Sequence, residues 1–214
     1  MLLYITYAIV DCNNFYVSCE RVFEPQFGQK PVVILSNNDG CVISGSQEAK
    51  SLGIAMGAPE FKICAELNAL NIKVFSSNYA LYCDFSARVM NILKQFSPNV
   101  EVYSIDEAFL NFDGMHITNF EQYGLLMIER IQKWLGLPVS IGFASTKVLA
   151  KVANRIVKKY PVRTNGIYNI DSDEKRIKAL KWSKIEDVWG IGSQLSKKLK
   201  AIHVIYSFRA LKLD

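Results

Sequence analysis

The feature that most constrains this chain is an adjacent pair of acids, Asp106 and Glu107, inside residues 100–112. Apolar and polar side chains alternate over short runs on both sides of the pair, which is the period of a half-buried β-strand. Because neighbouring side chains on a strand point to opposite faces, we expect the two carboxylates to converge in a tight turn between two strands. Such carboxylates repel each other unless a cation neutralises them. The pair alone fits both a Mg²⁺ site and a solvated acidic turn.

A third acid, Asp11, favours the metal site. It ends residues 4–10, an apolar run rich in β-branched and aromatic side chains that predicts a buried strand. An acid at the end of such a strand, beside a second strand that carries two more, predicts a three-carboxylate cluster at a sheet edge. Two-metal phosphoryl transfer requires such a cluster, with its ions about 3.5–4 Å apart.

The order of these motifs resembles that of the Y-family translesion DNA polymerases. Asp11 is followed by Phe15 and Tyr16, and Ser-Ile-Asp-Glu-Ala-Phe comes far downstream at residues 104–109, as in the catalytic palm of that family. Residues 36–43, 75–82 and 188–192 are similar to the UmuC-like branch. The resemblance covers nearly the whole chain. It implies error-prone, template-directed DNA synthesis past lesions.

The alternation of predicted strands and helices indicates an α+β fold with a sheet layer. By resemblance, the palm comprises residues 1–24 and 78–165, the fingers 25–77, and the thumb 166–214. The expected strands are residues 4–10, 31–35, 41–44, the pair around Asp106, and 139–143. The expected helices are one capped by Asn13 or Asn14 and running to about Val22, then 46–52, 78–96, 121–135 and 146–160. Residues 161–166 are expected to be a linker.

The helix predicted at residues 146–160 carries an apolar stripe on Val148, Val152 and Ile156. Basic side chains recur about every four residues on another face: Lys147, Lys151, Arg155 and either Lys158 or Lys159. A basic stripe is usually a solvated face, but the neighbouring acidic cluster favours contact with phosphates. Farther on, a Gly-Ile-Gly segment at residues 190–192 predicts a helix-hairpin-helix, whose glycines let backbone N–H groups approach a DNA phosphate.

The resemblance also implies roles for individual residues. Two Mg²⁺ ions are expected on Asp11, Asp106, Glu107 and the backbone carbonyl of Cys12. Tyr16 is the expected steric gate against a ribose 2′-hydroxyl. The expected nucleotide contacts are Phe15, Tyr16, Ser44, Lys50 and Lys158, and the expected DNA contacts are Lys147, Lys151, Gly190, Gly192, Lys197 and Lys198.

The sequence departs from the family pattern at three places. Residues 44–46 are Ser-Gly-Ser where relatives of this branch carry an Arg. His203 replaces a thumb glycine, a change that is unfavourable if φ is positive. The residues up to Asp214 do not include the little-finger domain that the family uses to grip DNA. The resemblance further implies primer–template DNA, dNTP, a UmuD-like protein, RecA and a sliding clamp as partners, although the C-terminal segments that dock the last three are missing.

Charge and composition agree with a nucleic-acid partner. The net charge is +5, and residues 147–214 hold 16 Lys and Arg against 6 Asp and Glu, whereas residues 1–146 hold 9 against 14. The five cysteines have no zinc-like spacing and are expected to be reduced and buried. We expect a soluble, cytoplasmic protein without a signal peptide or membrane span. Two alternatives remain open from the sequence, a non-catalytic DNA-binding fragment and another two-metal enzyme such as a nucleotidyl cyclase.

Overall fold

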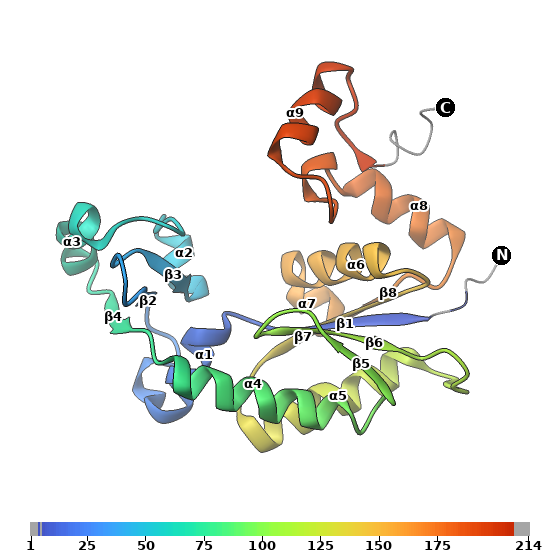
Figure 1. The fold of residues 1–214 in the computed structure, drawn as a ribbon, viewed down its shortest axis with the longest axis horizontal. Coiled ribbons are helices and arrows are strands. Elements are labelled where there is room, and N and C mark those ends of the chain that lie inside the picture. Colours follow the sequence, from blue (N-terminus) through green and yellow to red (C-terminus); the bar gives the residue numbers. More distant parts are fainter. Residues whose placement is uncertain (1–3, 5, 208–214) are drawn as a thin grey trace. The chain divides into compact units, whose positions relative to one another are not determined.

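A computed structural model describes residue 4 and residues 6–207. The chain forms two compact units. The large unit comprises residues 1–11, 93–130 and 139–214, and the small unit comprises residues 12–92 and 131–138. Both combine sheets with helices, so the predicted α+β class is confirmed (Figure 1).

The large unit is built on a five-stranded sheet with the strand order β5-β6-β1-β7-β8. Strand β6 pairs antiparallel with both β1 and β5, and β8 pairs parallel with β7. The bounds are β1 Tyr7–Cys12, β5 Asn99–Val102, β6 Glu107–Asn111, β7 Val139–Ala144 and β8 Ile167–Asn169. Residues 167–169, predicted to belong to the thumb, are therefore a strand of this sheet.

Helices cover both faces of this sheet. Helix α6 (Lys147–Lys159) lies over one face, and α5 (Phe120–Leu135) lies under the other (Figure 1). Two consecutive residues of β7 show why. Gly142 approaches the backbone of α6 so closely that a Cβ atom would lie 2.3 Å from Ala150 O, whereas the Phe143 side chain points to the opposite face, near Gly124 of α5. Glycine at 142 lets α6 pack directly on the strand.

Helix α6 begins where the sequence predicts, because Thr146 caps it by accepting a hydrogen bond from Leu149 N. Its predicted apolar stripe is partly wrong. Val152 and Ile156 are buried, but Val148 is 37% exposed. Small residues, Ala150 and Ala153, fill the interface with the sheet instead, since the close approach leaves no room for larger side chains.

The C-terminal part of the large unit contains α7 (Pro161–Thr164), α8 (Asp173–Trp182), the 3₁₀ helix η2 (Ile185–Asp187) and α9 (Ser193–Ala201). Helix α7 occupies the segment predicted to be a linker. The Gly190 backbone has φ +90° in the predicted hairpin, which favours glycine. His203 has φ +62°, the unfavourable conformation anticipated for a side chain at this position.

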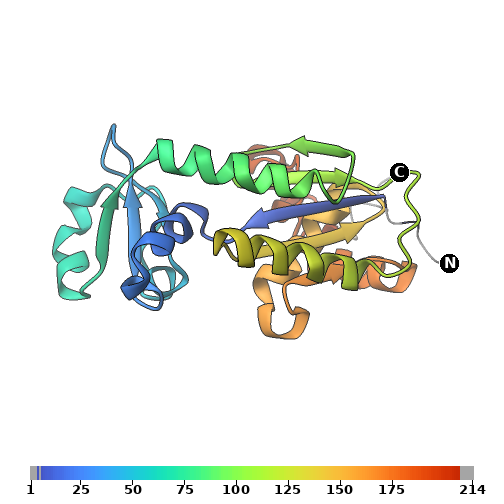
Figure 2. The ribbon, with the colours of Figure 1, turned by 90° about the horizontal axis from the view of Figure 1, so that it is seen from below.

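The small unit contains a three-stranded sheet in the order β3-β2-β4. Strand β2 pairs antiparallel with β3 and parallel with β4. Figure 2 shows these strands beside the helices of the small unit. The bounds are α1 Phe15–Phe23, η1 Pro25–Phe27, β2 Val32–Leu35, β3 Val42–Gly45, α2 Gln47–Ser51, α3 Glu60–Ala69, β4 Lys73–Ser76 and α4 Tyr79–Leu93. Helix α3 and strand β4 were not predicted as separate elements.

Two further expectations are corrected in the small unit. Asn14 stands at the N-cap of α1, but its backbone is left-handed (φ +47°) and its side chain does not cap the helix. The cysteines were expected to be buried, but Cys64 and Cys83 are exposed. In the part of the chain that the structure describes, no helix has the length and apolarity to span a bilayer.

Candidate active site

The centre of the candidate site is a carboxylate pair on neighbouring strands. Asp11 on β1 lies directly opposite Glu107 on β6, two residues beyond the pair Ile9 and Phe109. Because side chains on a strand alternate, Asp11 and Glu107 share the face of Ile9 and Phe109, which pack in the core against α6. The register therefore aims both acids at the helix. Like charges directly opposite on a sheet are destabilising and need compensation.

Two lysines of α6 supply this compensation. The Lys158 ammonium pairs with Asp11 Oδ2, and Lys151 Nζ lies 2.9 Å from Glu107 Oε2. The lysines are seven residues, or about two helical turns, apart, so they lie on one face of α6. Asp11 is only 3% exposed. A buried carboxylate without a partner would be strongly unfavourable, so these ion pairs are part of how the site folds.

The same environment separates the protonation states of the two acids. Burial, followed by the hydrogen bond to Glu107, raises the pKa of Asp11 to about 7 despite the opposing effect of Lys158. Burial also acts to raise the pKa of Glu107, but the hydrogen bond from Asp11 and the Lys151 ammonium outweigh it and hold this pKa below its ordinary value. When the pair holds a proton, that proton therefore resides mainly on Asp11 rather than on Glu107.

Asp106 lies in the turn before β6, as predicted, but its side chain has a different partner. Ser104 Oγ donates to Asp106 Oδ1 at 2.6 Å and accepts from Glu107 N at 3.1 Å, which fixes the turn. Within residue 4 and residues 6–207, no three His, Cys, Asp or Glu side chains stand together as a metal site. Asp11 and Glu107 contact each other, and each carboxylate pairs with a lysine ammonium group. A metal site on these two acids and Asp106 stays a prediction.

Every predicted basic position of the α6 stripe faces an acid. Lys147 Nζ lies 2.5 Å from Glu101, and Arg155 Nη2 lies 2.5 Å from Asp187, beside the Lys151 and Lys158 pairs. The sequence did not identify Glu101 or Asp187. Both acids could have been noticed in the sequence, because each lies just before a motif described above. Only the fold shows which lysine or arginine pairs with each acid.

An aromatic cluster surrounds Lys151 and was also missed. Its ammonium lies 4.1 Å from the Tyr103 ring centroid and 5.6 Å from that of Trp189, both within cation–π range. Trp189 Nε1 donates to the Tyr103 hydroxyl at 3.0 Å, and both rings contact Phe109. Trp189 directly precedes Gly190, so the predicted hairpin is tied to the turn that carries the acids.

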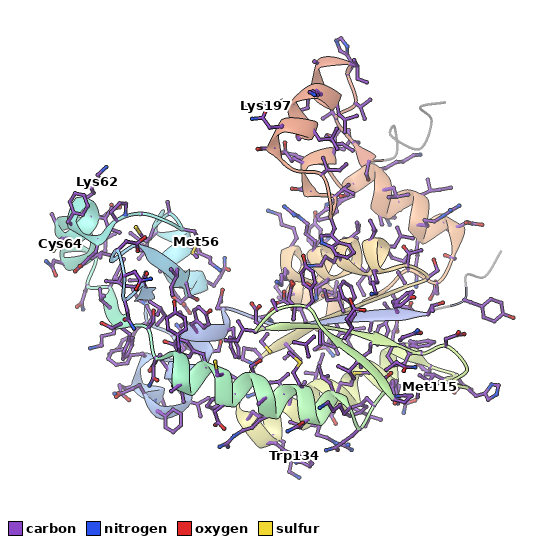
Figure 3. The ribbon with its side chains drawn as sticks, in the orientation of Figure 1. Met56, Lys62, Cys64, Met115, Trp134 and Lys197 are labelled. Carbon is purple, nitrogen blue, oxygen red and sulfur yellow. The ribbon has the colours of Figure 1, made fainter. Side chains whose placement is uncertain are left out.

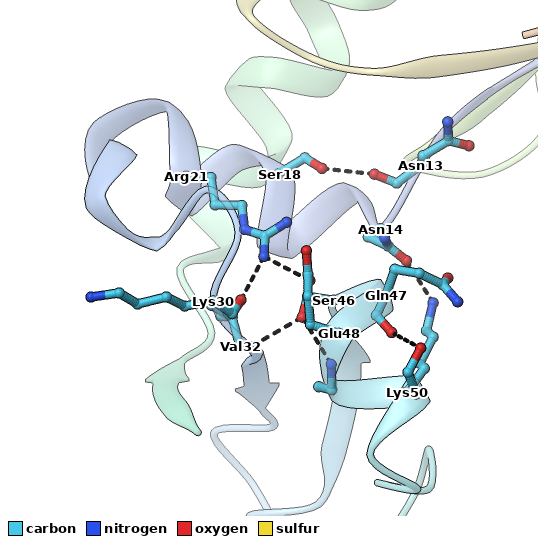
Figure 4. Close-up of polar contacts among 12 residues, drawn as sticks. Asn13, Asn14, Ser18, Arg21, Lys30, Val32, Ser46, Gln47, Glu48 and Lys50 are labelled. Carbon is cyan, nitrogen blue, oxygen red and sulfur yellow. Dashed lines mark hydrogen bonds and ion pairs between the residues drawn. The ribbon is translucent and has the colours of Figure 1, made fainter. Parts of the chain in front are cut away.

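The small unit holds the other predicted nucleotide contacts. Lys50 Nζ donates to Asn14 Oδ1 at 2.5 Å, next to Phe15 and Tyr16 at the start of α1 (Figure 4). The Tyr16 ring stacks on Tyr82 with centroids 4.3 Å apart. Phe15 is buried. The predicted gate is thus held in an aromatic stack rather than loose in solvent.

Hydrogen bonds also hold the start of α2 against its neighbours. Ser46 caps α2 by accepting from Ala49 N and also accepts from Val32 N, which ties the helix to strand β2. Arg21 donates to both Lys30 O and Glu48 (Figure 4). Ser44 is buried in β3, so contact of its side chain with a nucleotide stays a prediction.

The predicted DNA contacts of the hairpin lie at the surface. Gly190, Gly192, Lys197 and Lys198 are all exposed. Gly192 is the N-cap of α9, and a Cβ atom there would meet nothing within 4 Å. Figure 3 shows Lys197 pointing outward from α9. The backbone at this helix start is open to an approaching phosphate.

Comparison with known proteins gives the family of the chain. Residues 10–155 match the impB/mucB/samB family. The chain belongs to this family, which confirms the resemblance inferred from the motifs.

The curated relatives are longer than this chain. It is 44% identical to the protein UmuC of Salmonella typhimurium over 199 residues, which is 92% of this chain and 47% of UmuC. It is 32% identical to DNA polymerase IV of Picrophilus torridus over 205 residues, or 92% of this chain and 56% of that protein. The chain thus spans about half the length of the curated relatives that it matches.

Solved structures share the fold. The insertion ternary complex of Dbh DNA polymerase matches with a TM-score of 0.83 at 26% identity, covering 100% of this chain and 61% of that one. DinB from Sulfolobus solfataricus matches with a TM-score of 0.80 at 27% identity, again covering 100% of this chain and 61% of that chain.

Proposed function

We propose that this chain catalyses template-directed transfer of a nucleotide from a dNTP to a primer 3′-hydroxyl, as part of error-prone DNA synthesis past lesions. The observation that carries the proposal is the pair Asp11 and Glu107, opposite each other on adjacent strands and neutralised by lysines of α6. The similarity to UmuC and to DNA polymerase IV supports it.

The residues present fit divalent cations. Two carboxylates share a face and a third lies one residue away. Burial raises the pKa of Asp11, and a bound cation would favour the ionised form of this carboxyl group. Asp11, Asp106, Glu107 and the Cys12 carbonyl would hold two Mg²⁺ ions. Such ions, when bound, lower the pKa of the attacking hydroxyl and neutralise the triphosphate and its leaving group.

The protein's own side chains have defined tasks in this scheme. Asp11 must lose its proton before it can ligate a cation, since only the ionised carboxylate is a good ligand. Lys158 is 44% exposed at its side chain, so it can turn from Asp11 toward a triphosphate. Lys50 would bind a nucleotide triphosphate, and Tyr16 would exclude a ribose 2′-hydroxyl.

A non-catalytic DNA-binding role is the alternative. The observation that favours it is the ion-paired state of the site, in which lysines already occupy the carboxylates. Primer extension distinguishes the two roles. Asp106→Asn should abolish Mg²⁺-dependent extension by the 214-residue chain, because metal-centred electrostatics contribute on the order of several kcal/mol to the barrier.

The matched control is Asp113→Asn, which removes an exposed acid just after β6. It should extend primers as the wild type does. Circular dichroism spectra of both variants should match the wild type. Extension by Asp106→Asn within about tenfold of wild type would reject the assigned metal role, and no extension by the wild type would favour the alternative.

A further inference from the structure

A pocket of about 650 Å³ lies in the large unit, away from the carboxylate pair. It opens beside the edge strand β8, and α5, α6, α7 and α8 each contribute to its wall. Its volume is in the range of pockets that bind small molecules. The wall combines aromatic and cationic side chains: Tyr160, Tyr168, Trp182, Arg163, Lys175 and Lys178.

The aromatic part of this wall is pre-arranged. The rings of Tyr160 and Trp182 lie 6.1 Å apart at 56°, and Trp182 Nε1 donates to the Tyr160 hydroxyl at 3.1 Å. This bond fixes both rings without covering them, since Tyr160 is 36% exposed. The Arg163 guanidinium lies 6.0 Å from the Tyr160 ring centroid. A flat ring that enters the pocket therefore meets fixed π faces.

The cations make the pocket suitable for an anion. Arg163 and Lys178 are exposed, and Lys175 pairs with Asp171 at 2.9 Å. Among the lining residues that the structure describes, Glu121 is the single acid. Aromatic faces for a base beside cations for phosphates are the combination that binds single-stranded nucleic acid without sequence preference.

The pocket is separate from the candidate active site. Ile156 of α6 lines the pocket, while Lys158 of the same helix pairs with Asp11. Two residues along an α-helix turn about 200°, so these side chains leave opposite sides of α6. A strand held in the pocket would thus leave the carboxylate pair accessible.

We propose that this pocket binds an unpaired base of single-stranded nucleic acid, with the flanking phosphates on Arg163 and Lys178. A duplex, whose bases are stacked and paired, offers no base to the pocket. The proposal concerns binding only and does not depend on the polymerase activity proposed above.

The test measures the affinity of the whole chain for a short fluorescein-labelled oligothymidylate by fluorescence anisotropy, without Mg²⁺ or dNTP. Trp182→Leu removes a stacking face and should weaken binding about tenfold, the contribution of one base–aromatic stack. Trp182→Phe keeps a ring and should bind within about threefold of wild type. The double variant Arg163→Ala, Lys178→Ala should also weaken binding and reduce its salt dependence.

Lys181→Ala, with Lys184→Ala, is the matched control, because it removes the same charge from residues on or just after α8 that do not line the pocket. Binding of a blunt duplex should be equal in all variants. Equal loss in the control and pocket variants would overturn the proposal, since charge alone would then explain binding. So would unchanged binding by Trp182→Leu, or equally effective competition by polyglutamate.

Photo-crosslinking keeps the proposal testable if Trp182→Leu fails to fold. A thymidylate oligomer that contains 5-iodouracil should crosslink the wild type at Tyr160 or Trp182, as mapped by mass spectrometry. Crosslinks confined to the α9 surface or to the small unit would place the strand elsewhere and reject the pocket. Because no catalysis is measured, loss of primer extension would leave this result unaffected.

Discussion

The most specific consequence of the fold is that Gly142 cannot become alanine without moving α6. A Cβ atom built at this residue would lie 2.3 Å from both Ala150 O and Asn154 N, and 3.0 Å from Ala153 C. Ordinary contacts require roughly 3.4 Å or more, so α6 must retreat by about 1 Å from the strand. The obstructing atoms are backbone atoms, which cannot turn aside as a side chain can.

The energetic cost follows from this geometry. Overpacking of a core costs about 1–3 kcal/mol, and a rigid obstruction favours the upper part of that range. For a chain of this size we expect Gly142→Ala to lower the melting temperature by about 6–12 °C. The retreat of α6 also carries Lys151 and Lys158 away from the carboxylates, so primer extension should fall even where the protein is folded.

Gly124→Ala is the matched control. Its added Cβ atom would meet Ile167 Cδ1 at 2.8 Å and Phe143 Cε2 at 2.9 Å, which are side-chain rather than backbone atoms. Glycine inside a helix costs about 1 kcal/mol relative to alanine, which offsets the crowding in α5. Thermal melting by circular dichroism should therefore separate the variants clearly. Equal melting temperatures for Gly142→Ala and the wild type would refute the close packing of α6 on β7. Equal destabilisation by Gly142→Ala and Gly124→Ala would refute the argument that backbone atoms obstruct more than side-chain atoms do.

Other predictions follow from single contacts. Tyr16→Ala should raise ribonucleotide incorporation relative to deoxyribonucleotide without abolishing extension, and unchanged discrimination would leave Tyr16 only the structural role of its aromatic stack. Tyr103→Phe and Trp189→Phe should show a coupling free energy of about 1 kcal/mol in urea unfolding, because each removes one side of the same hydrogen bond; simple additivity would contradict this. The folded-state pKa of Asp11, raised from 3.8 to about 7, gives stability that is present at low pH and lost as pH rises toward 7; Asp11→Asn should lack this slope in metal-free buffer. Affinity of the chain for primer–template should fall steeply with salt, with extension by one or a few nucleotides per encounter under a DNA trap, and tight salt-insensitive binding would contradict phosphate-dominated contact.

The sequence by itself determined much of the fold. The period-2 alternation around Asp106 and the apolar run before Asp11 predict two strands of the large-unit sheet, and the structure contains both. Thr146 and Ser46, small hydroxyl residues ahead of helical segments, are the N-caps of their helices. These features are local, because hydrogen bonding and side-chain alternation act over a few residues. Residue type alone did not predict that Cys64 is exposed, because burial depends on which other residues pack against a side chain.

Only the tertiary structure decided which charges meet. The sequence proposed three acids in one cluster, but strand register sets Asp11 against Glu107, and the Ser104 hydroxyl holds Asp106 in the turn. The basic stripe of α6 is visible in the sequence, whereas its four acidic partners come from separate segments brought to one helix face. Gly142 links the sequence to this tertiary arrangement of charges. One residue without a side chain lets α6 approach the sheet, and this approach brings the α6 lysines within reach of the carboxylates.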